Sequence, residues 1–132
     1  YRTELNKKTK RVALFSALSD KAANGNLIIL DECKLESYKT SEMVKMFAAL
    51  GLQKDVEKTY KVGDEKKTRT ETVACKTLLV LPEADRVVVK SCANIPTAAT
   101  TLYSTINVYE ILNAEKLVIT KAAALKLEEV YA

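Results

Sequence analysis

Short apolar runs that alternate with helical patterns are the feature that most limits how this chain folds. The runs have the length of strands and occupy residues 27–30, 77–81, 99–103 and 116–120, of which the third is the weakest. Because helical segments separate them, consecutive strands are joined by crossover connections and run parallel. Parallel sheets are covered by helices on both faces. The pattern therefore predicts an α/β fold, a three-layer α/β/α sandwich with a mostly parallel four-stranded sheet.

Caps and apolar side chains at helical spacing mark the helices. Asn6 is placed to cap the first helix, and Asn107 with Glu110 forms a capping box before the fourth. In the second helix we expect Val44 to face inward beside Met43. The run Leu27–Leu30 contains no polar residue, which is typical of a strand buried on both faces. The predicted helices cover residues 6–23, 40–50, 82–92, 108–112 and 120–130.

The chain is expected to form one domain over residues 1–132. Its length and its apolar content of 48% are sufficient for a single core without disulfides or metal. Residues 54–76 interrupt the regular pattern, because Lys, Glu, Asp and Thr alternate there with little helical or sheet periodicity. The residues around Gly63 indicate a turn, such as the tip of a hairpin. We therefore expect an exposed, partly mobile insertion at about 54–76.

The positive charge is concentrated near the start of the chain. The net charge is +4, and residues 1–23 hold six basic and two acidic side chains. Four of these cations, Lys7, Lys8, Lys10 and Arg11, occur within five residues at the predicted start of the first helix. Clustered cations of this kind suit contacts with nucleic-acid phosphates. A solvated helix start is the alternative interpretation.

Catalysis is disfavoured by the residue types present. The chain has no histidine, which removes the commonest general base and metal ligand. Its three glycines lie in neither the dinucleotide nor the phosphate-loop spacing. Asp31 and Glu32 follow the first strand, where active sites of α/β proteins gather. Adjacent strand residues point to opposite faces, however, so these two carboxylates are not expected to converge on one substrate.

The cysteines and the apolar runs indicate an intracellular, soluble protein. Cys33, Cys75 and Cys92 are odd in number and lack the C-x-x-C spacing, so they are interpreted as reduced thiols of a cytoplasmic protein. We predict no metal and no cofactor. No apolar run approaches the roughly 20 residues needed to span a membrane, and no signal peptide is expected.

Seven segments cover nearly everything in the chain except residues 54–76. The segments are LNKKTKRVALFSALSDKA, NLIILDE, KTSEMVKM, TLLVLPEAD, SCANIP, NVYEILNAEKLVITKAA and LEEVYA. Together and in this order they resemble one known family, the bacterial form of the universal large ribosomal subunit protein 4.

The resemblance implies a non-enzymatic structural constituent of the large ribosomal subunit that binds large-subunit rRNA and supports assembly. It also implies neighbouring large-subunit ribosomal proteins as partners and, for some members, the leader mRNA of their own operon. The family carries a long basic loop, and the resemblance places the start of this chain where that loop rejoins the domain.

Departures from the family pattern concern possible RNA contacts. Phe15 and Ala93 occupy positions where a basic residue is expected, Ala93 within what is usually an R-N-I-P motif. Thr97 stands where glycine is usual, and residues 54–76 replace what is usually a very short connection. Losing two cations is expected to weaken RNA binding and lower its salt dependence.

The predicted RNA contacts centre on the first helix. Lys7, Lys8, Lys10 and Arg11 are the main candidates, with secondary contacts at Asn94, Asn107 and Lys121. For Asn107, a purely capping role is an equal alternative, and Lys21 and Lys90 are expected to be merely solvated. Two other functions remain open, a non-catalytic interaction module or engineered scaffold with weakened RNA binding, and a small-molecule enzyme.

Overall fold

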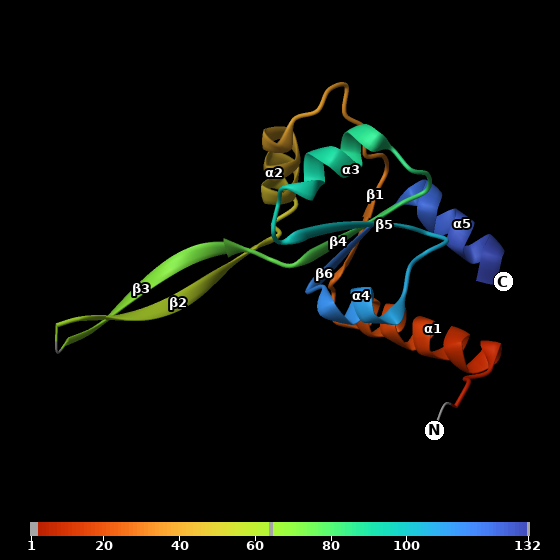
Figure 1. Cartoon of the computed structure of the whole chain (residues 1–132), viewed down its shortest axis with the longest axis horizontal. Helices are drawn as coiled ribbons and strands as arrows, with labels where there is room; N and C mark the ends of the chain where they lie inside the picture. Colours follow the sequence, from red (N-terminus) through yellow and green to blue (C-terminus); the bar gives the residue numbers. More distant parts are fainter. Residues whose placement is uncertain (1–2, 64, 132) are drawn as a thin grey trace.

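The computed structural model describes residues 3–63 and 65–131, and these residues form two sheets and five helices (Figure 1). The helices are α1 (Lys7–Ala23), α2 (Thr40–Ala49), α3 (Arg86–Ala93), α4 (Val108–Asn113) and α5 (Lys121–Tyr131). The strands are β1 (Leu27–Leu30), β2 (Gln53–Val62), β3 (Glu65–Ala74), β4 (Thr77–Leu81), β5 (Ala98–Leu102) and β6 (Lys116–Thr120).

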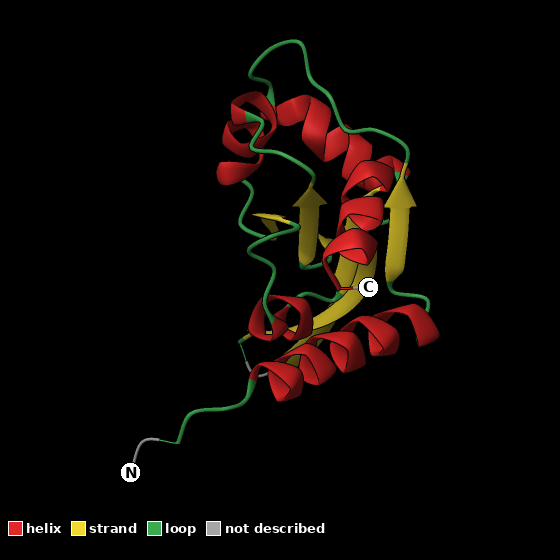
Figure 2. Ribbon diagram, turned by 90° about the vertical axis from the view of Figure 1, so that its right-hand side faces the viewer, coloured by secondary structure: helices red, strands yellow, loops and turns green. Residues whose placement is uncertain are grey.

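The larger sheet has the order β1-β6-β4-β5, and all three of its strand pairings are parallel. Side chains of β4 alternate between two apolar clusters, with Leu78 and Val80 in one and Leu79 and Leu81 in the other. Residues from α1, α4 and α5 complete the first cluster, while α2 and α3 complete the second. Helices therefore cover both faces (Figure 2), which confirms the predicted three-layer sandwich.

The expectation that β1 is buried on both faces was wrong. β1 lies at the edge of the sheet, where it pairs only with β6. Ile28 and Leu30 pack against the second cluster, but Ile29 is 60% exposed. A four-residue apolar run does not distinguish an edge strand from a central one, because position in the sheet depends on the rest of the chain.

The segment predicted as an irregular insertion is a regular antiparallel hairpin, β2–β3, which projects from the domain (Figure 1). Its ten paired positions run from Gln53 opposite Ala74 to Val62 opposite Glu65. Gly63 has a φ of 65°, a left-handed conformation that glycine adopts without strain at the turn. Most of its side chains are exposed, and they lie on regular strands, so the expected lack of sheet order is wrong. The period of two was hidden because both faces of the hairpin meet solvent and carry polar residues.

Two side chains of the helices differ from expectation. Val44 is 48% exposed, so only Met43 and Phe47 of α2 are buried. Lys21 was expected to be solvated, but it is 8% exposed and its Nζ donates a hydrogen bond to the carbonyl oxygen of Ala114 over 2.6 Å. This contact joins α1 to the end of α4, so Lys21 has a structural role.

Candidate nucleic-acid interface

The first turns of α1 present the predicted basic cluster to solvent. Lys7, Lys8, Lys10 and Arg11 are all exposed, and no ion pair involves them within residues 3–63 and 65–131. At 3.6 residues per turn, the four side chains cover an arc of roughly 160° around the helix. They can therefore meet phosphates on more than one side of α1.

The start of α1 also lacks the usual stabilisation of a helix N-terminus. Asn6 occupies the cap position, but its side chain accepts no hydrogen bond from the first turn, so the predicted cap interaction is wrong. The first turn contains no acidic residue. The positive end of the helix dipole, its amide N–H groups and four cations thus all favour an anion at this place.

Arg11 is held at the edge of a small groove by an aromatic pair. Its guanidinium lies 5.9 Å from the ring centre of Tyr131, which makes an edge-to-face contact with Phe15 at 5.6 Å. A guanidinium over an aromatic ring is attracted by the negative face of the ring. The end of α5 therefore orients Arg11. Phe15, at a position where a basic residue was expected, thus packs against the ring that contacts Arg11.

Asn107 lies in the same groove, and the two other secondary candidates do not. The groove, of about 290 Å³, is lined by Lys10, Arg11, Leu14, Ile106, Asn107, Val108 and Tyr131. The Asn107 side chain accepts a hydrogen bond from the Glu110 amide at 2.9 Å, which confirms its capping role. Its side-chain Nδ2 donates to no residue that the structure describes, so the two N–H donors are available to another partner.

Asn94 and Lys121 are far from this groove. Asn94 follows α3, which covers the opposite face of the sheet from α1. Lys121 begins α5, and Tyr131, which contacts Arg11, ends it. Ten residues of helix separate the two by about 15 Å. Each is exposed, so each could contact a different segment of an extended partner.

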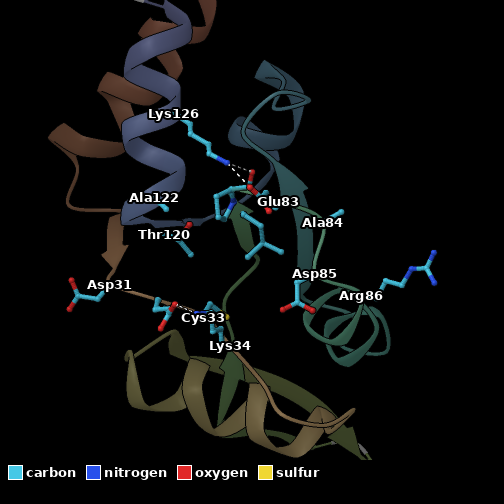
Figure 3. Close-up of a pocket in the computed structure, with 13 residues that line it drawn as sticks. Asp31, Cys33, Lys34, Glu83, Ala84, Asp85, Arg86, Thr120, Ala122 and Lys126 are labelled. Carbon is cyan, nitrogen blue, oxygen red and sulfur yellow. Dashed lines mark hydrogen bonds and ion pairs between the residues drawn. The ribbon is translucent and has the colours of Figure 1, made fainter.

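A larger pocket lies elsewhere, at the carboxyl ends of β1, β4 and β6 (Figure 3). It has a volume of about 560 Å³, and three of its four carboxylates have partners. Glu32 pairs with Lys34, Glu83 pairs with Lys126 at 3.0 Å, and Asp85 accepts a hydrogen bond from the Val87 amide to cap α3.

This pocket does not assemble catalytic chemistry. Asp31 and Glu32 lie beyond the end of β1 and both line this pocket, so the expected divergence by strand alternation does not apply to them. In Figure 3 the Asp31 side chain points away from Asp85. Burial and the Asp85 carboxylate raise the pKa of the Cys33 thiol. Burial, and then Cys33, raise the pKa of Cys92 to about 11. Both thiols are therefore protonated at neutral pH and are poor nucleophiles.

Two further findings concern the described residues alone. No group of three or more Cys, Asp or Glu side chains there is placed to hold a metal ion. None of the helices described combines the length and apolarity needed to cross a membrane.

Comparison with known proteins assigns the chain to a family. The model of the ribosomal protein L4/L1 family matches residues 1–130. The chain belongs to this family. Family membership confirms the resemblance noted in the sequence, and the family's members carry the names of ribosomal proteins, not of enzymes.

Curated relatives are similar over the whole chain. Each is called large ribosomal subunit protein uL4. The proteins from Alkaliphilus metalliredigens and Alkaliphilus oremlandii are both 41% identical, over 97% and 100% of this chain. The protein from Heliobacterium modesticaldum is 40% identical over 100% of it. These matches cover 52%, 54% and 54% of the relatives, so the chain spans about half of their length.

Proposed function

We propose that this domain is a non-catalytic structural constituent of the large ribosomal subunit in the cytoplasm, and that it binds large-subunit rRNA and supports assembly. The names of the relatives support the choice of subunit. The start of α1 supports the mode of binding, because it holds, at the positive end of a helix, four exposed cations that make no ion pair with any residue the structure describes.

The placement of these cations is unfavourable for the helix itself. A cation in the first turn opposes the helix dipole, and each such charge typically costs about 0.3–1 kcal/mol. Acidic residues or a side-chain cap would stabilise this end, and α1 has neither. A bound anion would make the same cations favourable. The uncapped, cationic first turn of α1 is therefore the observation that best supports the proposal.

The contacts expected from this surface are to the RNA backbone. Lys7, Lys8 and Lys10 act as point charges, whereas Arg11 can grip a phosphate with two parallel hydrogen bonds. Such contacts fix position without reading sequence, and specificity comes from the shape of the RNA. Asn107 supplies a donor beside Arg11, while Asn94 and Lys121 would contact other RNA segments.

Two further kinds of partner are proposed. Neighbouring large-subunit proteins follow from the assignment to the subunit. The leader mRNA of the protein's own operon would use the same α1 surface, because phosphate contacts do not discriminate between RNA molecules.

A salt titration of binding to a large-subunit rRNA fragment tests the proposal. Contacts with four phosphates predict that log K falls against log[salt] with a slope of about −3, at 0.7 per phosphate on unpaired RNA. Changing the four α1 cations to Gln should remove most of this slope. A matched control changes four other exposed lysines to Gln, namely Lys34, Lys39, Lys45 and Lys90.

Two results would overturn the assignment of RNA binding to α1. One is an equal effect of both variants, which would mean that only the total charge matters. The other is no binding of the unmodified chain at low salt, which would favour the interaction module.

A further inference from the structure

The outer half of the hairpin has no role in the core of the domain. This part, residues 57–62 and 65–70, is here called the outer ribbon, and each of its side chains is exposed. Ten residues at about 3.3 Å each carry the tip of β2 roughly 30 Å from its base. Figure 1 shows the hairpin extending away from the domain. An isolated two-stranded hairpin is only marginally stable in water, so its residues should favour pairing unless another role constrains them.

The outer ribbon instead places cations directly opposite each other. Lys58 is paired with Arg69, and Lys61 is paired with Lys66. Like charges opposite each other destabilise a hairpin. Of these four cations, Lys58 forms an ion pair with Glu71 at 2.7 Å. The other three make no ion pair with any residue that the structure describes.

An exposed aromatic ring lies beside three cations on one face of the outer ribbon. Tyr60 is 46% exposed and stands opposite Lys67, on the same face as Lys58 and Arg69. Among described residues, its ring has no aromatic or cation–π partner. The other face of β3 carries Lys66, Thr68 and Thr70. The five cations of the outer ribbon exceed its two described acidic residues by three: the cations are Lys58, Lys61, Lys66, Lys67 and Arg69, and the acids Glu57 and Glu65.

We propose that the outer ribbon is a second RNA-binding site, which takes an unpaired RNA segment. Its cations contact backbone phosphates, and Tyr60 stacks on a base. Cations beside an exposed aromatic ring are the combination that binds single strands with little sequence preference. An acidic protein could satisfy the cations, but it would leave the ring of Tyr60 without a base to stack on.

This proposal deepens the proposed function, because both assign RNA as the partner. The outer ribbon and the start of α1 lie toward opposite ends of the long axis in Figure 1. Two sites held at a fixed distance bind one RNA more tightly than either alone when the RNA can reach both. The domain would thereby hold two segments of rRNA apart at a set spacing.

Two-dimensional NMR of the whole chain with a short single-stranded RNA, which cannot reach both sites, tests the outer ribbon directly. We expect amide signals of residues 58–60 and 67–69 to shift, because the RNA covers that face. Affinity read from these signals should fall about fivefold in Tyr60→Thr, the lower end of the range for stacking. Tyr60→Phe keeps the ring and should bind as the unmodified chain does.

A charge variant with a matched control tests the role of the cations. Lys67→Gln with Arg69→Gln removes two charges from the ribbon, and it relieves repulsion, so the hairpin should remain folded. The slope of log K against log[salt] should become shallower by about 1.4, at 0.7 per phosphate contact. Lys45→Gln with Lys90→Gln removes two charges from α2 and α3 and should leave the slope at the ribbon unchanged.

The readout separates this proposal from the one for α1. Shifts in α1 without shifts in the outer ribbon would overturn the second site and leave the first intact, and a protein partner would then be the occupant to seek. Shifts in the ribbon alone would support the second site and overturn the first. Shifts in neither would overturn both, and equal slopes for the two charge variants would overturn the cation contacts.

Discussion

Replacing Lys21 by Met tests whether the one buried lysine described in α1 is structural. The variant removes the ammonium group but keeps a side chain of similar length. It abolishes the 2.6 Å hydrogen bond to the carbonyl oxygen of Ala114 and leaves that oxygen without a described partner. A hydrogen bond to a charged group contributes about 1.5–3 kcal/mol, and relief from burying the charge offsets part of this. We expect a net loss of about 1–2 kcal/mol.

Urea and thermal unfolding followed by circular dichroism measure this loss. For a domain of this size, about 1–2 kcal/mol corresponds to a fall in Tm of roughly 4–8 °C. Lys45→Met on α2 is the control, because Lys45 is exposed and should change stability by less than about 0.5 kcal/mol. RNA affinity should stay the same in Lys21→Met. A stability equal to that of the control would show that Lys21 is merely solvated, which would refute the structural role.

Three further predictions concern the core, the thiols and the base of the hairpin. Leu79→Ala should lower the free energy of unfolding by about 2–5 kcal/mol, since Leu79 is fully buried in a central strand, and a loss under 1 kcal/mol would contradict this. With iodoacetamide at pH 8, half-buried Cys33 should be alkylated before Cys92, whose pKa is about 11; mass spectrometry of the native protein checks the order. A hydrogen bond from Lys54 lowers the pKa of Glu115, so this pair stabilises the fold above pH 4.5 and is lost as pH falls through the lowered pKa. The acid unfolding curve of Glu115→Gln should therefore lack this contribution, and curves of identical shape would contradict it.

Patterns that depend on local periodicity could be predicted from the sequence. The run at β4 is buried at all five positions, and its length and composition alone predict such a strand. Asn107 caps α4 as its spacing from Glu110 predicts. The alternation of strands and helices was sufficient to predict the three layers, because few topologies are compatible with that order of elements.

Features that depend on distant parts of the chain could not be predicted. The edge position of Ile29 follows from which strand pairs with β6, and the burial of Lys21 follows from where α4 ends. The hairpin lacks a buried face, so its strands show no apolar alternation. Within the candidate interface, the cluster on α1 was visible in the sequence, whereas its proximity to Asn107 and Tyr131 required the fold.

The central claim is that the start of α1 carries cations for an RNA partner and at a cost to the helix. The double variant Lys7→Glu with Lys8→Glu tests the cost to the helix and the contribution to RNA binding in one protein. The change should raise the free energy of unfolding by roughly 1.2–4 kcal/mol, because two unfavourable cations are removed and two acidic residues that complement the helix dipole are added. Affinity for a large-subunit rRNA fragment should fall steeply in the same variant. A gain in stability together with weaker binding is the predicted result, and unchanged RNA affinity would contradict the claim.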